Sequence, residues 1–220
     1  MKIVVKLGGA VAEGAAATVL ALAEEHDVCV VHGAGPQISD EMERCGLPVR
    51  FVGGRRVTTA AGLAVVRRSL CAVNRSLCAA LAPRAVGLIG DEIGLRAVHV
   101  PELGLVGDAV PSRPALVEDA LDAGLVPVVA PLAAGRLNVN ADEAAAALAV
   151  GLEADRLLFV TDVPGVFLDG AVVPALAAHD ADRMLGDGTF EGGIVPKLRA
   201  AVAAARLGVP AEIGTTAVTA

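Results

Sequence analysis

Short apolar runs, each four or five residues long, alternate with alanine- and leucine-rich stretches through most of the chain. Runs of this length are typical of strands that are buried on both faces of a parallel sheet. They occupy residues 28–31, 86–89, 126–130 and 157–160, and residues 1–7 form a similar opening strand. The stretches between them predict helices at residues 15–25, 37–44, 59–81, 115–122, 141–151 and 196–207. The alternation therefore predicts an α/β fold, a three-layer αβα sandwich with a mainly parallel central sheet.

Two segments differ from this pattern. Residues 51–58 and 103–110 contain glycines within short extended runs, and we expect each to form a β-hairpin that projects from the sheet. Residues 211–216 predict a last strand. No linker separates independent domains, but a hinge is expected near residues 133–137.

Composition argues against several classes of protein. Lys and Arg total 18 against 25 Asp and Glu, which gives a net charge of −7 and a sequence pI near 5.1. Surfaces that bind nucleic acid or anionic membranes need a dense basic patch, so we expect neither partner. The chain has no Trp and no Tyr, which makes a base-stacking platform improbable. Its longest apolar stretches stop short of the roughly 20 residues that a membrane-spanning helix needs.

Cysteine and histidine spacing gives no sign of a metal site. The four histidines show no ligand spacing, and no CxxC pair occurs. We expect Cys29, Cys45, Cys71 and Cys78 to be reduced core residues. No secretory signal precedes the first strand, and together these features predict a cytoplasmic protein.

The chain retains only three lysines among its 18 basic residues. Lys6 ends the first strand, just before Gly8 and Gly9, and Lys197 begins a helix. A cation is unfavourable at the positive end of a helix dipole, and an anionic ligand would reverse that penalty. A compact ammonium also serves sites that the broad guanidinium group cannot. The alternative is that both are ordinary surface lysines.

Glycine turns follow the first two strands. Gly8 and Gly9 form the turn after the first strand, and the sequence Gly33-Ala34-Gly35-Pro36 forms the turn after the second. Without a Cβ, backbone N–H groups can approach phosphate oxygens, and the helix that follows adds positive potential. Neither turn matches a Walker A loop or the GxGxxG pattern. Each could be only a tight turn, but the pair, with a lysine beside one of them, favours phosphate binding.

Polar residues follow further strands. Asp142 lies in the first turn of a predicted helix, where it is either a capping residue or a carboxylate that orients both lysines. Thr161 and Asp162 end another strand at the edge where open α/β sheets bind ligands. Arg55 and Arg56, on the first hairpin, could clamp a carboxylate or simply be solvated.

Taken in order, these motifs resemble the amino acid kinase family, and within it the branch that phosphorylates N-acetyl-L-glutamate. The matching stretches cover nearly the whole chain: residues 5–9, 31–36, 54–58, 138–142, 158–165 and 192–197. The resemblance implies the carbamate kinase-like version of the αβα fold. It also implies an amino-terminal lobe, residues 1–137, for the acyl amino acid and dimerisation, and a carboxyl-terminal lobe, residues 138–220, for ATP.

The resemblance also implies roles for individual residues. Lys6 and Lys197 would neutralise the transferring phosphoryl group, and Asp142 would orient them. Phosphate oxygens would be bound by the backbone of Gly8, Gly9, Gly33 and Gly35, and the nucleotide would contact Thr161 and Asp162. The acetylglutamate carboxylates would be held by Arg56 and Asn138, beside Gly33 and Ala34, although Ala34 stands where the family has a glycine.

The implied reaction is attack of the γ-carboxylate on the γ-phosphate of MgATP, the second step of arginine biosynthesis. An ionised carboxylate needs no general base, and Mg²⁺ would be held mainly by the phosphates, with no protein ligand assigned. We expect an arginine-insensitive homodimer. Two alternatives remain open: another carboxylate kinase of the family, such as one that acts on carrier-bound aminoadipate, and a non-catalytic ligand-binding member. A nicotinamide-dependent oxidoreductase is a weaker third.

Overall fold

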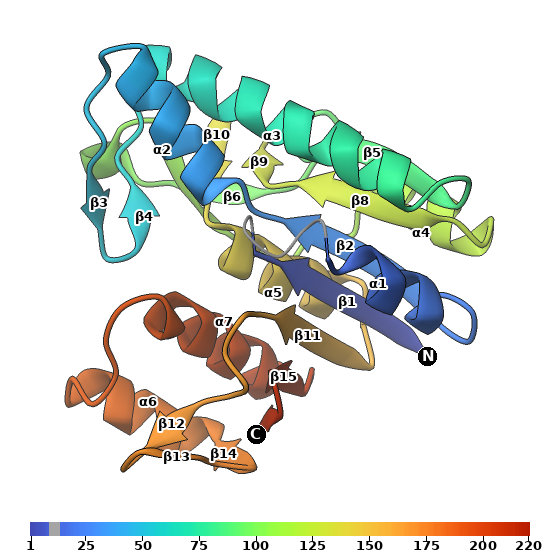
Figure 1. The fold of residues 1–220 in the computed structure, drawn as a ribbon, viewed down its shortest axis with the longest axis vertical. Coiled ribbons are helices and arrows are strands. Elements are labelled where there is room, and N and C mark those ends of the chain that lie inside the picture. The colour runs from blue at the N-terminus through green and yellow to red at the C-terminus, as the bar shows by residue number, and fades with distance from the viewer. Residues whose placement is uncertain (9–13) are drawn as a thin grey trace.

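The computed structural model of the chain describes residues 1–8 and 14–220. An eight-stranded sheet runs through the molecule in the order β14-β16-β15-β11-β1-β2-β8-β5 (Figure 1). Its strands are β1 (Lys2–Leu7), β2 (Asp27–His32), β5 (Ala85–Ile89), β8 (Val126–Ala130), β11 (Arg156–Val160), β14 (Ala175–Ala177), β15 (Ala211–Ile213) and β16 (Thr216–Thr219). The helices are α1 (Ala16–Leu22), α2 (Gly35–Arg44), α3 (Ala60–Ala80), α4 (Ala115–Asp122), α5 (Ala141–Gly151), α6 (Ala178–Gly186) and α7 (Ile194–Arg206).

Neighbouring strands of this sheet run parallel except for the β15–β16 pair, which confirms the predicted mainly parallel sandwich. The strands β1, β2, β8 and β5, from the first part of the chain, form one half of the sheet. The later strands form the other half, and the halves join where β1 pairs with β11. The carboxyl end of β1 therefore lies at the middle of the sheet, between the ends of β2 and β11.

Side chains of β1 alternate between the two faces of the sheet, because successive residues of a strand point in opposite directions. Ile3, Val5 and Leu7 pack in a buried cluster with residues of α1 and α3. Val4 belongs to the cluster on the other face, with residues of α4, α5 and α7. Lys6 shares the parity of Val4, so the strand itself directs this lysine toward the α5 side.

Smaller sheets stand at the edge of the main one. A four-stranded sheet has the order β6-β7-β10-β9, and two hairpins are formed by β3–β4 and β12–β13. Their strands are β3 (Phe51–Val52), β4 (Arg55–Arg56), β6 (Ala97–His99), β7 (Val106–Ala109), β9 (Leu132–Ala133), β10 (Leu137–Val139), β12 (Phe167–Leu168) and β13 (Ala171–Val172). The β3–β4 pair confirms the hairpin predicted at residues 51–58.

The hairpin predicted at residues 103–110 is wrong. This segment supplies a single strand, β7, which pairs antiparallel with the upstream β6 and parallel with β10. A short 3-10 helix, Pro101–Leu103, makes the connection, and Gly104, with φ of +82°, turns the chain. Gly107 has a different reason to be glycine, because a Cβ there would lie 2.7 Å from the Ala97 Cβ on the paired strand.

The remaining expectations about helices, the last strand and the hinge agree with the structure only in part. Helices α4 and α5 match their predicted bounds, whereas α6 was not predicted. Residues 211–216 form more than one strand, because β15 turns into β16. Residues 133–137, where a hinge was expected, link the antiparallel strands β9 and β10, and the division into two lobes stays a prediction.

The cysteines are free, but not all belong to the core. Cys29 is buried, Cys71 and Cys78 are partly exposed, and Cys45, at the carboxyl end of α2, is exposed. The expectation of a core position is therefore wrong for Cys45. Within the described residues, no helix has the length and apolar character needed to cross a membrane.

Candidate active site

A cavity of about 340 Å³ opens at the carboxyl ends of β1, β2 and β11. Its wall also includes the first turns of α2 and α5, the β3–β4 hairpin and Lys197 of α7. Among the described residues, four basic ones line it (Lys6, Arg55, Arg56 and Lys197) against two acidic ones (Asp142 and Asp162). In a chain with a net charge of −7, this local surplus of positive charge marks a place where anions are attracted.

Asp142 lies between the two lysines that the sequence analysis singled out. Lys6 Nζ is 2.8 Å from Asp142 Oδ1, and Lys197 Nζ is 3.9 Å from Asp142 Oδ2. The side chains of Lys6 and Asp142 are only 6% and 7% exposed. Burial lowers the pKa of Lys197, the Asp142 carboxylate opposes that shift, and the charge of Lys6 adds to it. One carboxylate thus holds two ammonium groups that would otherwise repel each other.

The three side chains reach this point from three elements. Lys6 is directed to the α5 side by strand alternation, as described above. Asp142 stands in the first turn of α5, which Asn140 caps by accepting hydrogen bonds from the N–H groups of Asp142 and Glu143 at 2.8 and 3.3 Å. Lys197 lies in the first turn of α7, which has no side-chain cap. An uncapped helix start leaves backbone N–H groups available for an anion.

The second glycine turn lies where the sequence predicts it. Gly33, Ala34 and Gly35 line the cavity together with Gly8, whereas Gly9 lies outside the described residues. Helix α2 begins at Gly35 without a side-chain cap. Because Gly35 and Pro36 line the cavity, the positive end of the helix dipole faces it. Ala34 is 2% exposed and packs in a cluster with Ile38 and Met42 of α2. The extra methyl group is therefore accommodated in the core.

His32, just before this turn, is fully buried and holds a structural position. Asn74 Nδ2 lies 3.1 Å from His32 Nε2 and also donates to the Val128 carbonyl. Because Asn74 is the donor, Nε2 accepts and the ring is neutral. Burial lowers the pKa of His32 to about 4. The neutral ring fixes the end of β2 from which the glycine turn leaves.

Arg56 and Asn138 form one polar wall of the cavity. Arg56 is buried and donates to the Gly35 carbonyl at 3.0 Å and to Ser39 Oγ at 2.9 Å. Asn138 Nδ2 donates to Thr58 Oγ1 at 3.0 Å, and Thr58 Oγ1 donates to the Arg56 carbonyl at 2.7 Å. Burial lowers the pKa of Arg56, and a group in that position gains from binding an anion. The pair is suited to holding a carboxylate.

Thr161 and Asp162 follow β11 and line the cavity, and the charge of Asp162 acts on Lys197. Thr161 Oγ1 donates to Asp162 Oδ1 at 3.1 Å. Both are partly or fully exposed, so they could contact a ligand that enters from solvent. Their predicted role toward a nucleotide stays a prediction.

Sequence reasoning missed several residues of the site. It gave no role to Thr58, which links Asn138 to Arg56, or to Phe51, whose ring centroid lies 4.5 Å from Arg56 Cζ. Phe51 is 52% exposed and covers the guanidinium from the hairpin. The position of Thr58, two residues after Arg56, could have indicated that Thr58 belongs to the site. No pattern in the chain indicates a role for Phe51.

No group of three or more His, Cys, Asp or Glu side chains placed to hold a metal occurs among residues 1–8 and 14–220. The arrangement can instead bind phosphate through ammonium groups and backbone N–H groups, and a carboxylate through Arg56 and Asn138. Such a cavity suits transfer of a phosphoryl group, which depends on positioning and charge neutralisation.

Comparisons with known proteins agree with this reading. A model of the amino acid kinase family matches residues 1–215. The acetylglutamate kinase of Rubrobacter xylanophilus is 44% identical over 221 residues, which cover 96% of this chain and 87% of the relative. The solved structure of smu.665 from Streptococcus mutans has a TM-score of 0.90 at 28% identity and covers 99% and 98% of the two chains. Carbamate kinase from Giardia lamblia, solved with AMP-PNP, shares the fold with a TM-score of 0.75 at 15% identity, over 99% and 98% of the chains.

Proposed function

Because the chain belongs to the amino acid kinase family, we propose that it transfers the γ-phosphoryl group of ATP to the γ-carboxylate of N-acetyl-L-glutamate, the second step of arginine biosynthesis. The product is an acyl phosphate. The curated relatives that span most of the chain carry the name of this activity.

The observation that carries the proposal is the position of Asp142 between Lys6 and Lys197 at a cavity edge rich in backbone donors. In the transition state, negative charge spreads over the phosphoryl oxygens and the bridging oxygen to ADP. Lys6 approaches this position from β1 and Lys197 from the first turn of α7. Asp142 keeps both ammonium groups in place before substrate binds, so little reorganisation is needed during the reaction.

The acceptor end of the cavity accounts for the second substrate. Arg56 and Asn138 hold the carboxylates of N-acetylglutamate, and the ionised γ-carboxylate attacks the γ-phosphorus in line with the departing ADP oxygen. The P–O bond to ADP breaks as the carboxylate oxygen forms a new one. No proton leaves the nucleophile, because the carboxyl group is already ionised at neutral pH. The backbone of Gly8, Gly33 and Gly35 binds the phosphate oxygens.

Magnesium enters as part of the substrate MgATP. The carboxylate of Asp142 is engaged with two lysines, and no described cluster of acidic residues offers a ready-made cation site. The phosphate oxygens therefore supply most of the ligands, and Mg²⁺ contributes neutralisation of phosphate charge. Asp162 also lines the cavity, where its negative charge opposes the fall in the pKa of Lys197.

The test is formation of an acyl phosphate, trapped as a hydroxamate, with MgATP and a panel of acceptors. The panel holds N-acetylglutamate, glutamate, aspartate and N-acetyl-aminoadipate. Product with N-acetylglutamate alone supports the proposal. Product with another acceptor moves the reaction to a different pathway but keeps the mechanism, and no product with any acceptor would favour a carrier-bound substrate or a non-catalytic protein.

We also propose that the protein acts as a homodimer that arginine does not inhibit. Light scattering of the purified protein measures the first property, and an assay with millimolar arginine measures the second. A hexamer, or loss of activity with arginine, would contradict this part of the proposal.

A further inference from the structure

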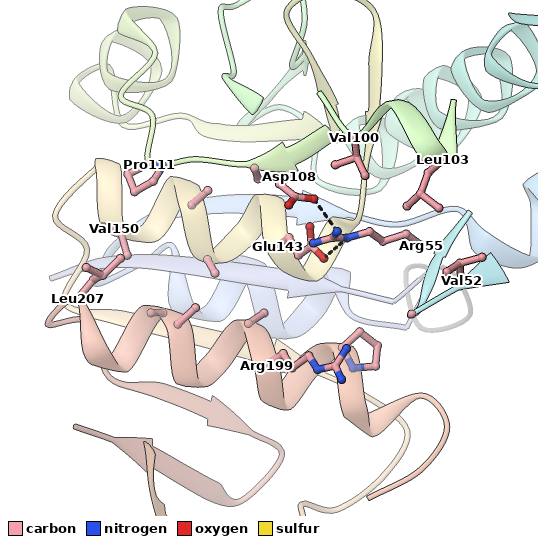
Figure 2. Close-up of a pocket in the computed structure, with 18 of the residues that line it drawn as sticks. Val52, Arg55, Val100, Leu103, Asp108, Pro111, Glu143, Val150, Arg199 and Leu207 are labelled. Carbon is pink, nitrogen blue, oxygen red and sulfur yellow. Dashed lines mark hydrogen bonds and ion pairs between the residues drawn. The ribbon is translucent and has the colours of Figure 1, made fainter. Parts of the chain in front are cut away.

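A second cavity, of about 580 Å³, is lined by Arg55 and by residues of α5 and α7 (Figure 2). Helices α5 and α7 pack against each other in the core, and their small side chains form much of the cavity wall: Ala146, Ala147, Ala200, Ala203 and Ala204. Its charged lining includes Arg55, Asp108 and Glu143, which point toward one another (Figure 2), and Glu102, whose charge also acts on Arg55. Arg55 lines both cavities and so stands in the partition between them.

Arg55 joins three elements through two ion pairs. Its Nε donates to Glu143 Oε1 at 2.9 Å, and its Nη1 lies 2.6 Å from Asp108 Oδ1. Arg55 belongs to β4, Asp108 to β7 and Glu143 to the first turn of α5. The guanidinium group presents several donors in one plane, so a single side chain can bridge both carboxylates.

The neighbours of these residues are the proposed site residues. Arg56 follows Arg55 on β4 and reaches into the catalytic cavity, whereas Asp142 precedes Glu143 on α5. The Arg55–Glu143 contact therefore ties the element that carries the carboxylate-binding arginine to the element that carries the lysine-orienting aspartate. Asn140 adds a second link between them, because its Nδ2 donates to the Gly54 carbonyl at 3.3 Å.

Within this cluster, the Arg55–Glu143 pair is more sheltered than the surface pair of Arg113 and Glu153, whereas the Asp108 side chain is 46% exposed. The Arg55 and Glu143 side chains are 28% and 24% exposed, whereas Arg113 and Glu153 are 49% and 80% exposed. Burial raises the pKa of Glu143, and the hydrogen bond from Arg55 opposes that shift. Partly buried pairs are screened less by salt and solvent than exposed pairs. The contact is therefore able to hold the hairpin, which has only a two-residue pair of strands of its own.

We propose that Arg55 is a positioning residue, which holds the β3–β4 hairpin against α5 and β7 so that Arg56 meets the acceptor carboxylate at a fixed distance from Asp142. This inference rests on the proposed function of the cavity. When the contact is lost, the hairpin spends a smaller fraction of its time in the position that binds the acceptor. The apparent affinity for the acceptor falls in proportion to that fraction. On the nucleotide side, Thr161 and Asp162 follow β11 and Lys197 belongs to α7, and β11 does not pair with the hairpin strands.

The test compares Arg55→Gln with the wild type in steady-state kinetics. We expect the KM for N-acetylglutamate to rise at least five-fold, while the KM for ATP changes less than two-fold. Arg55→Lys keeps one charged contact and should recover part of the loss. Glu143→Gln removes only one of the two ion pairs of Arg55 and should raise the KM for N-acetylglutamate less than Arg55→Gln does. The double variant should be no worse than Arg55→Gln, because that substitution already removes both contacts.

The matched control is Arg113→Gln. Arg113 also bridges two carboxylates, those of Glu118 and Glu153, but it lines neither cavity. Its removal should leave both KM values within two-fold of the wild type. Equal KM values for Arg55→Gln and Arg113→Gln would overturn the proposal, as would a loss confined to kcat.

Hydrogen exchange of the ligand-free proteins gives a readout that needs no activity. Backbone amides of residues 50–58 should exchange faster in Arg55→Gln and Glu143→Gln than in the wild type or Arg113→Gln. Unchanged exchange in this segment would overturn the proposed holding role. A wild-type protein that phosphorylates no acceptor would instead refute the proposed function, and the exchange data would still decide whether Arg55 holds the hairpin.

Discussion

Two of the three lysines approach the same carboxylate, and the third supplies a control. Lys197→Ala removes a positive charge that meets the developing negative charge of the phosphoryl group. We expect kcat to fall by about 100- to 1,000-fold, the usual cost of losing one preorganised electrostatic contact. The KM for ATP should change much less. Lys197→Arg should not restore the rate, because the broad guanidinium group does not replace a compact ammonium.

Lys2→Ala is the matched control for that series. Lys2 Nζ donates to the Leu152 carbonyl at 2.8 Å, away from the cavity. Its removal should leave kcat within two-fold of the wild type. Steady-state kinetics on the variants measures all of these values, and a kcat for Lys197→Ala within ten-fold of the wild type would refute the role given to Lys197.

His32 makes stability depend on pH. Its pKa falls from 6.5 to about 4 on burial, so the unfolded chain binds more protons than the folded one between those values. Stability should therefore decrease as the pH falls from 6.5 toward 4, by about 3 kcal/mol in total. Urea unfolding at pH 7.5, 5.5 and 4.5 measures this slope. It should be shallower in His32→Gln and unchanged in His179→Gln, whose parent side chain is exposed; equal slopes in all three proteins would contradict the assignment.

At the residue scale, the sequence analysis singled out residues whose type was rare or whose spacing was tight. The chain retains few lysines, so Lys6 and Lys197 stood out, and Asp142 followed from its place at a helix start. Arg55 was flagged only together with Arg56. Its carboxylate partners, Asp108 and Glu143, carry no pattern of their own, because nothing local to either residue records that β4, β7 and α5 meet.

At the scale of elements, α5 shows how a local signal sets the geometry of the site. Asn140 Oδ1 accepts from two N–H groups of the first turn. Asn140→Ala should therefore destabilise the protein by about 1 kcal/mol. Asn140→Ser keeps an oxygen that caps a helix equally well and should recover most of that stability. Urea unfolding provides the measurement, and an Asn140→Ser variant as unstable as Asn140→Ala would show that the cap is not the source of the loss.

Helices with strong patterns were predicted well, and weak ones were not. Helix α5 has its cap at Asn140 and an alanine run that ends at a glycine, so both ends were visible in the chain. Helix α6 has nine residues, several of them polar, and follows an apolar strand directly. The wrong hairpin at residues 103–110 also came from a misleading local signal. Gly107 is a glycine because the Ala97 side chain lies close to it, and not because the chain turns there.

At the scale of the whole molecule, the cavity draws on both halves of the sheet, so its two substrates should stabilise the fold together. A ligand at 100 times its Kd stabilises the folded state by about 2.7 kcal/mol, which corresponds to a rise in Tm of roughly 5–10 °C for a chain of this size. N-acetylglutamate and Mg–AMP-PNP should each raise Tm, and the mixture should raise it further. Differential scanning calorimetry measures these shifts.

NADH is the control ligand in that experiment and should leave Tm unchanged. A shift with NADH would revive the oxidoreductase alternative. A mixture of N-acetylglutamate and Mg–AMP-PNP that stabilises no more than the better single ligand would contradict simultaneous binding in one cavity.

The sequence by itself determined the αβα class, most helix positions and the three charged residues at the centre of the site. These depend on period, on caps and on residue type, which are local properties of the chain. Only the tertiary structure decided that Lys6 and Lys197 meet at Asp142, that Thr58 links Asn138 to Arg56, and that Arg55 separates two cavities. Such contacts join segments far apart in the chain, and their distances follow from how strands pair and helices pack, which no single segment encodes.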